Sequence, residues 1–447
     1  MRLAPFLALA LALVTRLSAA APPTPHAFLE KLCDDFGPRL TGSAANAAAL
    51  DHLASELRAL GLTPEKIPFA MPGWERGADR VELLAPVARV LRAASLSYTQ
   101  PHAPFEAGVV ALGNGRPTDL PAGDLAGRIG LLAHTSPLAA SEIVALVTAR
   151  GLRGVLFADR EDGGQLLART GSFSGTPLPG PIYSVTQEEG RWMQRLLARG
   201  SPVRVRLETR SRCRPVETAN LRVVIPGREK SRLIVGAHFD SWDLGQGAMD
   251  NGLGTAQLYA LAAALRGTTP HHTVELVWFN GEEQGLFGSR HAAAQLGATP
   301  VVAMLNLDMV GVPIAVNALG DDTLVPALER WHATRPDNRV PKGVENLNWA
   351  AADHTPYQLA GVRAFTFTAP IPRESVRYYH DFADTIDKVS PKLLDDSTAI
   401  ILDCVRTIAN DPALTARRRT REETEKLFTR FGLEKRLANF GLWPIGK

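Results

Sequence analysis

Apolar residues recur along this chain with two different periods. Near the start, spacings of three and four residues predict two amphipathic helices. Their apolar faces are Phe28, Leu29, Leu32 and Phe36 for the first, and Leu50, Leu53, Leu57 and Leu60 for the second. We expect the second helix to end at Gly61, because glycine is favoured just past a helix C-terminus. From Val81 to about Thr99 the pattern is short and strand-like.

From Ala219 onward, apolar runs alternate with helical segments. The runs are "LRVVIPG", "RLIVGAH", "TVELVWF", "VAMLNLDM" and "RAFTF", and helices are predicted near 252–265 and 391–409. Strands that are apolar throughout and alternate with helices indicate a mostly parallel sheet with both faces covered. The predicted fold class is therefore α/β, with a mostly parallel mixed sheet and helices on both faces.

The stretch 106–212 has a different character. "GRIGLLAH" and "RGVLFAD" are typical of strands, "AASEIVALVTARG" of a helix, and "TGSFSGTPLPGP" of a loop rich in glycine, serine and proline. The composition changes at both ends of this stretch. We therefore expect a small α/β domain inserted into the larger one.

The first residues have the form of a secretory signal. Arg2 precedes an apolar run from Leu3 to Val14 that is too short to span a membrane, and small residues follow it. We expect cleavage after Ala20 and a secreted or periplasmic protein with no membrane association afterwards; Arg16 leaves an uncleaved anchor open. The predicted division of the chain is a signal peptide at 1–20, a catalytic domain at 21–105 and 213–412, the insertion at 106–212, and a charged helical tail at 413–447.

Composition narrows the classes of partner. The formal net charge of +3 on 447 residues is nearly balanced, and we expect no binding of nucleic acid. Cys33, Cys213 and Cys404 lie far apart and form no CxxC pair, which argues against a cysteine zinc cluster. One disulfide among them is left open, as is a homodimer.

Acidic and histidine residues follow the predicted strands. The first such run, "HFDSWD", begins with His238 and Asp240, and Asp250 stands just before a helix. The remaining residues of this kind are Glu282, Glu283, Asp308 and His380, in "NGEE", "NLDM" and "YYHDFADT". Because the carboxyl ends of parallel strands share one edge of the sheet, we expect these side chains to meet there.

Imidazole and carboxylate ligands together suit zinc. Five such ligands are more than one zinc ion needs, so the set favours two ions bridged by a carboxylate and a water. Glu283 can then bind a metal, while Glu282 stays free to accept a proton from water. The alternative for this pair is a helix start, where acidic residues are also favoured.

These segments resemble peptidase family M28, a family of zinc-dependent peptidases with a zinc exopeptidase fold. The order of "HFDSWD", "NGEEQGLFGS", "NLDMVG" and a late histidine carries the resemblance, and the layout of the chain is similar to the carboxypeptidase Q, or plasma glutamate carboxypeptidase, branch. The inserted stretch resembles a protease-associated domain. Asn251 departs from the pattern, because many relatives have an acidic residue there.

The resemblance implies a role for each residue. Asp250 would bridge two zinc ions, with His238 and Asp308 on one ion and Glu283 and His380 on the other. Glu282 would be the general base. Asp240 would orient the imidazole of the neighbouring histidine ligand.

The expected function is hydrolysis of short peptides or dipeptides by a dizinc exopeptidase. The sequence leaves open whether it acts as an aminopeptidase, a dipeptidase or a carboxypeptidase. It also leaves open an aminopeptidase for longer peptides, a single-zinc glutaminyl cyclase and a non-catalytic binding homologue. His354, in "ADHTPYQLAG", could contact substrate or support the site, and for Tyr378 and Tyr379 core packing is favoured over lining the pocket.

Overall fold

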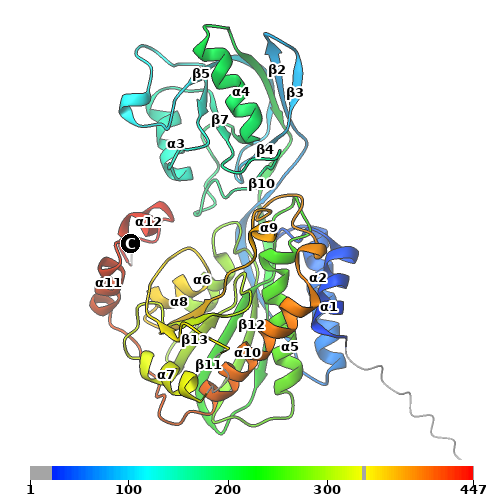
Figure 1. Ribbon diagram of the computed structural model, residues 1–447, viewed down its shortest axis with the longest axis vertical. Helices are drawn as coiled ribbons and strands as arrows, with labels where there is room; N and C mark the ends of the chain where they lie inside the picture. Colours follow the sequence, from blue (N-terminus) through cyan, green and yellow to red (C-terminus); the bar gives the residue numbers. More distant parts are fainter. Residues whose placement is uncertain (1–22, 335–338, 446–447) are drawn as a thin grey trace, which may run out of the picture.

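The computed structural model describes residues 23–334 and 339–445, and it has two lobes (Figure 1). The predicted signal peptide lies outside the described residues. The larger lobe is an α/β domain with a mixed sheet and helices on both faces, which confirms the predicted fold class. Within the described part of the chain, no helix is both long enough and apolar enough to cross a bilayer.

The sheet of the larger lobe has eight strands in the order β1-β10-β12-β11-β13-β16-β14-β15. Its central strands β12, β11, β13 and β16 run parallel, and the pairs β1–β10, β10–β12 and β14–β16 are antiparallel. The strands are β1 (Glu65–Glu75), β10 (Arg212–Ile225), β11 (Glu229–His238), β12 (His272–Phe279), β13 (Val301–Asn306), β14 (Ala315–Asn317), β15 (Val344–Glu345) and β16 (Ala364–Thr368).

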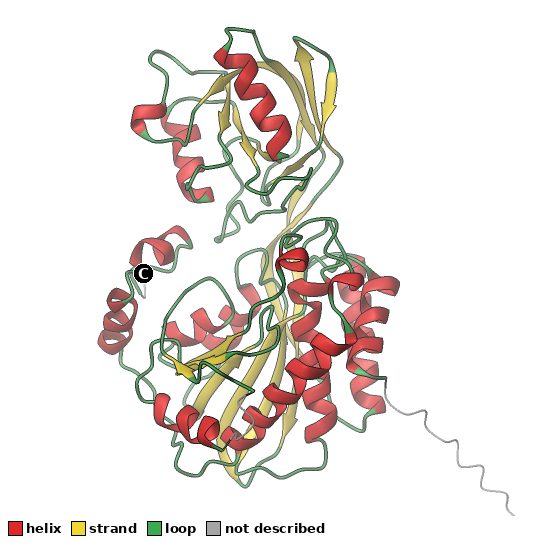
Figure 2. Ribbon diagram, in the orientation of Figure 1, coloured by secondary structure: helices red, strands yellow, loops and turns green. Residues whose placement is uncertain are grey.

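Helices cover both faces of this sheet (Figure 2). Along β11, Leu233 and Val235 pack in the core beneath α1, α2, α5, α7 and α10, whereas Ile234 packs on the opposite side with α6 and α8. Successive strand residues point to opposite faces, so a strand buried on both sides must be apolar throughout. The helices are α1 (Pro25–Phe36), α2 (Ala44–Ala59), α5 (Leu253–Leu265), α6 (Phe287–Ala294), α7 (Val325–Ala333), α8 (His354–Leu359) and α10 (Pro391–Ala409).

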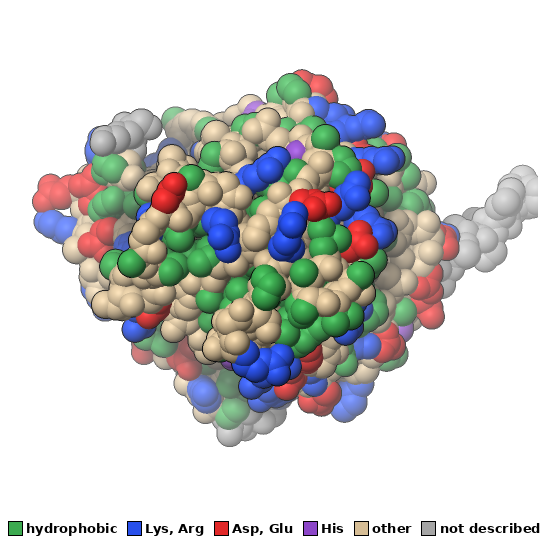
Figure 3. Space-filling view, turned by 90° about the horizontal axis from the view of Figure 1, so that it is seen from above, with side chains coloured by type: hydrophobic (Ala, Val, Ile, Leu, Met, Phe, Trp, Pro, Cys, Tyr) green, Lys and Arg blue, Asp and Glu red, His purple; other side chains and the backbone are tan. Residues whose placement is uncertain are grey.

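The smaller lobe is built on a second eight-stranded sheet, ordered β3-β2-β9-β5-β6-β7-β8-β4. Its elements are β2 (Asp79–Ala85), β3 (Arg89–Leu91), β4 (Ala93–Ser95), β5 (His102–Ala111), β6 (Ile129–Leu132), α3 (Ala140–Ala149), β7 (Gly154–Ala158), β8 (Ile182–Val185), α4 (Gln187–Ala198) and β9 (Arg204–Thr209). We call residues 79–209 the inserted domain. From above, basic, acidic and apolar side chains are interspersed on its outer face (Figure 3).

The predicted start of the insertion at residue 106 is too late. Strands β2, β3 and β4, which the sequence assigned to the catalytic domain, belong to the second sheet. The pairing that places them there joins Asp79 to Thr209 and is invisible to any local pattern. The two chain segments that connect the lobes are β1 and β10, which pair with each other from Glu65↔Arg222 to Glu75↔Arg212.

The charged tail forms a C-terminal arm, which we define as residues 415–445. It contains α11 (Arg421–Arg430) and α12 (Glu434–Asn439), drawn in red beside both lobes in Figure 1. Buried Phe428 and Leu437 pack with Ala350 of the larger lobe. The remaining short elements are η1 (Pro117–Asp119), η2 (Ala248–Gly252), α9 (Arg373–Val376) and η3 (Ile386–Lys388).

Candidate metal centre and active site

The histidine and acidic residues gather beyond the carboxyl edge of the parallel strands. His238 is the last residue of β11, Glu282 and Glu283 follow β12, and Asp308 follows β13. Asp250 lies in η2, immediately before α5. The glutamate pair lies in the loop that precedes α6, so it does not begin a helix.

The five predicted metal ligands form two groups that share Asp250. The Nε2 atom of His238 lies 3.0 Å from Oδ1 of Asp250 and 3.6 Å from Oδ1 of Asp308. The Nε2 atom of His380 lies 3.0 Å from Oδ2 of Asp250 and 3.2 Å from Oε2 of Glu283. Each oxygen of one carboxylate thus faces a different histidine, as a bridging ligand requires.

The donor set fits metal ions. Ligand atoms of His238, Asp250 and Glu283 lie within 4.8 Å of one another, and all three residues are buried. Oε1 of Glu283 is buried without a hydrogen-bond partner among the described residues, and Nε2 of His380 contacts the carboxylates of Asp250 and Glu283. Buried polar atoms are normally hydrogen-bonded, so an unsatisfied carboxylate oxygen beside other ligand atoms is expected of a metal ligand.

At these residues, burial and neighbouring charges shift the side-chain pKa values in opposite directions. Burial disfavours the carboxylate of Asp250, but hydrogen bonds with the two histidines outweigh it and hold its pKa well below the usual range. Burial raises the pKa of Glu283 to about 7, opposed by the charge of His380. Burial also disfavours the charged form of His380, but Glu283 and Asp250 outweigh it and raise the pKa to about 9. Such coupling is typical of functional sites.

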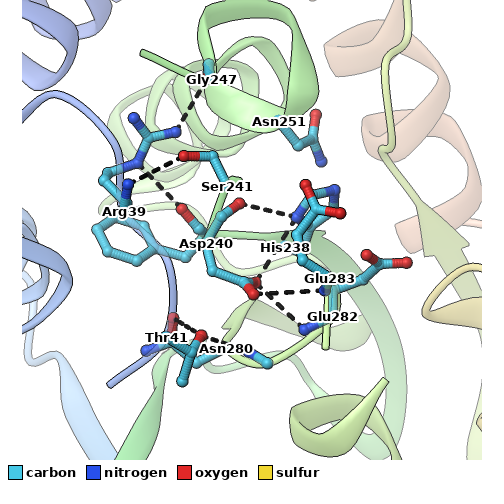
Figure 4. A network of polar contacts seen from close by, with 12 residues as sticks. Arg39, Thr41, His238, Asp240, Ser241, Gly247, Asn251, Asn280, Glu282 and Glu283 are labelled. Atoms are coloured by element: carbon cyan, nitrogen blue, oxygen red, sulfur yellow. Dashed lines mark hydrogen bonds and ion pairs between the residues drawn. The ribbon is translucent and has the colours of Figure 1, made fainter. Parts of the chain in front are cut away.

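Asp240 holds the glutamate loop in place (Figure 4). Its Oδ1 accepts the backbone N–H of Glu282 at 3.2 Å, and its Oδ2 accepts that of Glu283 at 3.4 Å. The Nδ1 atom of His238 contacts the backbone carbonyl of Asp240 at 3.0 Å, whereas the carboxylate lies 3.7 Å away. The predicted orientation of the imidazole is therefore supplied mainly by the carbonyl oxygen, because the carboxylate is committed to the loop.

Arg39 is a supporting residue that sequence reasoning missed. Its fully buried guanidinium donates to the carbonyls of Phe239 at 3.1 Å, Gln246 at 2.7 Å and Gly247 at 2.9 Å, and its backbone N–H donates to Oγ of Ser241 at 3.0 Å. These bonds join both ends of the segment between His238 and Asp250 (Figure 4). A buried arginine is uncommon unless its donors are satisfied, and no local pattern in the sequence indicates this burial.

Asn251 anchors the loop that carries Asp308. Its Nδ2 donates to the carbonyl of Leu307 at 2.8 Å, and its Oδ1 accepts the N–H of Met309 at 3.2 Å and of Gly254 at 3.0 Å. An amide can donate and accept at once, whereas an acidic residue in its ionised form only accepts. The departure from the family pattern therefore has a structural use here.

Asp384 supports Asp250, the residue that the two ligand groups share. Its carboxylate accepts the backbone N–H of Met249 at 2.8 Å and of Asp250 at 3.1 Å. Burial raises the pKa of Asp384 to about 7, opposed by these two hydrogen bonds. Asp384 is the last aspartate of "YYHDFADT", and the sequence alone predicted no contact for it.

A cavity of about 570 Å³ opens onto the metal-ligand cluster, with His238, Asp250, Glu282 and Asp308 in its wall. A second cavity of about 660 Å³ reaches Glu283 and His380 and is lined also by the inserted domain and the C-terminal arm. Glu282 lines both cavities, which leave room for substrate beside it.

The remaining predictions concern Tyr379, Tyr378 and His354, and the structure gives each a different outcome. Tyr379 lines both cavities and stacks on His380 with ring centroids 3.6 Å apart, so the favoured prediction of core packing was wrong for this residue. Tyr378 packs against the main core. His354 is buried, and its Nε2 contacts the carbonyl of Trp349 at 3.0 Å, which makes it a support for a cavity residue.

Comparison with known proteins shows which family and which relatives this part of the chain is similar to. The family model described as "Peptidase family M28" matches residues 220–405, which include every predicted metal ligand. "Aminopeptidase YwaD" of Bacillus subtilis is 26% identical over 85% of this chain and 85% of its own length. "Carboxypeptidase Q" of Bos taurus is 28% identical over 58% of this chain, which spans 59% of that relative. A zinc aminopeptidase structure from Bacillus subtilis shares the fold, with a TM-score of 0.70 and 21% identity over 88% of this chain and 100% of that one.

Proposed function

Because residues 220–405 match the model of peptidase family M28, we propose that this chain is a zinc-dependent exopeptidase that hydrolyses short peptides at a centre that holds two zinc ions. The observation that carries this proposal is the division of Asp250, whose two carboxylate oxygens lie 3.0 Å from His238 on one side and 3.0 Å from His380 on the other. Asp308 and Glu283 then complete the two ligand groups.

In this proposal the chain supplies the proton transfer and the substrate's orientation. Two bound zinc ions would lower the pKa of water and polarise the scissile carbonyl. Glu282 faces the same cavity as the ligands and is the residue that would take the proton from the attacking water and return it to the leaving amine. Burial raises its pKa well above the usual range, and the charge of His238 opposes that shift. Asp240 holds the backbone of this glutamate in position.

The proposed substrate size follows from the cavity walls. The catalytic domain provides Trp349 and Tyr379, the inserted domain provides Arg160 and Phe173, and the C-terminal arm provides Arg436. A cavity walled by three separate parts of the chain favours short peptides over folded proteins. Relatives named as aminopeptidases and as a carboxypeptidase both match, so a panel of dipeptides, aminoacyl amides and longer peptides, assayed with and without a chelator, would define the reaction.

Two neighbouring glutamates test the metal roles against each other. Glu282→Gln keeps the shape of the side chain and removes the base, so zinc content should stay near two per chain while kcat falls by roughly 10²- to 10⁴-fold. Glu283→Gln removes a ligand, so one zinc should bind more weakly and excess zinc should restore part of the activity. Elemental analysis and rates at several zinc concentrations measure both. The opposite assignment, or a wild-type content of one zinc, would contradict the dizinc proposal.

We also propose that the protein is exported, from the signal-like segment at its start. Protein recovered from the exported fraction should begin near Ala21 on N-terminal sequencing. Recovery with Met1 intact from that fraction would contradict cleavage.

A further inference from the structure

The cavity at the metal centre is lined by basic as well as acidic residues, and we call its arginine-lined part the basic wall. Four arginines line the same space as the ligands: Arg160, Arg373, Arg377 and Arg436. Arg160 comes from the inserted domain, the next two from α9 and the residue after it, and the last from α12 of the C-terminal arm. Among the described residues, the only acidic one in this wall apart from the catalytic cluster is Glu161.

Two of these arginines have no acidic partner in the described part of the chain. Among residues 23–334 and 339–445, no carboxylate forms an ion pair with Arg373 or Arg436. The guanidinium of Arg436 lies over the ring of Phe440, 5.8 Å from its centroid. The other two are weakly matched: Arg160 lies 3.7 Å from Glu161, and Arg377 lies 3.2 Å from the exposed Asp162. The wall therefore keeps an excess of positive charge.

A buried arginine elsewhere in this chain shows the geometry in which a guanidinium group pairs with a carboxylate. Nε and Nη2 of Arg76 contact the two oxygens of Asp243 at 2.8 and 3.1 Å, and Arg76 also pairs with Asp79. That bidentate geometry is what guanidinium groups form with carboxylates. In the cavity the arginines are present and the matching carboxylate is not contributed by the described chain.

We propose that the arginines at this wall bind a carboxylate of the peptide substrate, most simply its free C-terminal carboxylate. This inference rests on the proposed peptidase function and deepens it by naming the substrate class. A peptide whose scissile bond lies at Glu282 would direct its far end to the basic wall. Trp349 and Val376, which are 37% and 36% exposed, line the intervening surface and offer apolar contact to side chains.

The C-terminal arm fixes the position of Arg436. One residue earlier, Nζ of Lys435 lies 2.9 Å from Oε1 of Glu142 in the inserted domain, and one residue later, Leu437 is buried. Phe440 packs on Phe173 of the inserted domain, with ring centroids 4.0 Å apart. The arginine is thus held between two lobes, which limits how far its guanidinium can move from the cavity.

The test compares three substrates that differ in carboxylates: alanyl-alanine, alanyl-alanine amide and alanyl-glutamic acid α-amide. Zinc-loaded wild-type enzyme should cleave alanyl-alanine with a kcat/KM about 10- to 100-fold above that for its amide, which is the range for one charged hydrogen-bonded contact. Arg373→Gln and Arg436→Gln should each remove most of this difference, mainly through KM. Arg421→Gln is the matched control, because Arg421 pairs with Glu425 on α11 of the same arm.

The outcomes separate the two proposals. If no peptide is cleaved, the proposed function fails. If wild-type enzyme cleaves the acid and the amide equally, or if the variants slow both equally, the peptidase function stands and the carboxylate site is wrong. Wild-type enzyme could instead prefer alanyl-glutamic acid α-amide over alanyl-alanine amide. If Arg436→Gln lost that preference, the arginines would bind a side-chain carboxylate of the substrate. Thermal unfolding should show that the variants fold as wild type.

Discussion

Replacing Asp240 with asparagine separates positioning of the base from positioning of the metal ligand. In the structure, the Asp240 carboxylate accepts the N–H groups of Glu282 at 3.2 Å and Glu283 at 3.4 Å. Its carbonyl, which the substitution leaves in place, contacts Nδ1 of His238 at 3.0 Å. Asp240→Asn should therefore impair Glu282 while His238 keeps its orientation.

The magnitude follows from the bonds that change. Asparagine has one side-chain carbonyl oxygen, so its NH₂ group must face one of the two backbone N–H donors, and the surviving bond loses its charge. Hydrogen bonds to charged groups are worth about 1.5–3 kcal/mol each. A loss of about 2–3 kcal/mol in the placement of Glu282 lowers kcat by roughly 30- to 150-fold, because about 1.4 kcal/mol corresponds to a factor of ten. Zinc content should remain that of the wild type.

The assay is steady-state kinetics on a dipeptide together with zinc analysis of the same samples. Asp243→Asn is the control: it is the same substitution three residues further on, at a carboxylate that pairs with Arg76 and not with the glutamate loop. If Asp240→Asn lost zinc and regained kcat in excess zinc, its carboxylate would be positioning a metal ligand, either His238 or Glu283, and the reasoning would be wrong. An unchanged kcat in Asp240→Asn would also contradict the proposed role of the carboxylate.

Three further changes test the supporting residues. Arg39→Ala removes the side-chain donor from the carbonyls of Phe239, Gln246 and Gly247, the last of which keeps the N–H of Gly252, so the free energy of unfolding measured in urea should fall by about 3–5 kcal/mol; a loss below about 1 kcal/mol would refute this supporting role. Asn251→Asp removes the donor to a buried carbonyl and should cost about 1–3 kcal/mol in the same measurement, whereas equal stability would mean that the bond is dispensable. Burial lowers the pKa of His354 to about 4 from 6.5, so the unfolded chain takes up a proton first as the pH falls and stability is lost between about pH 6.5 and 4. That difference corresponds to about 3 kcal/mol, and urea unfolding across this range should show a shallower pH dependence for His354→Gln than for the wild type.

The catalytic cluster was predictable because its geometry depends on strand ends. His238, the glutamate pair and Asp308 each follow a strand, and the parallel pairing of β11 with β12 and β13 brings those ends to one edge. A local apolar run is sufficient to predict such a strand, and the order of parallel strands limits where its end can lie.

The supporting contacts depend on residues far apart in the chain, and no local pattern reveals them. Arg39 stands in the turn-rich "FGPRLTGS", yet its guanidinium bonds to Phe239 and Gly247. The start of the insertion depends on the pairing of β2 with β9, and the strand-like pattern near Val81 suited either domain. In both cases the local structure depends on a contact with a distant residue, and secondary-structure propensity does not predict which residue that is.

Residues that local sequence patterns predict supply the proposed catalytic chemistry, whereas segments that are placed by distant contacts shape the choice of substrate. The proposed base Glu282 and the proposed ligands His238, Glu283 and Asp308 lie at the ends of adjacent strands, so their spacing is fixed by backbone pairing at β11, β12 and β13. The walls of the cavity come from the inserted domain and the C-terminal arm, which meet through Lys435 with Glu142 and Phe440 with Phe173. Neither contact involves a strand of the catalytic sheet, so these contacts can change without loss of that sheet. Substitutions in the arm should therefore alter KM and substrate preference, whereas substitutions at the strand ends should alter zinc content and kcat.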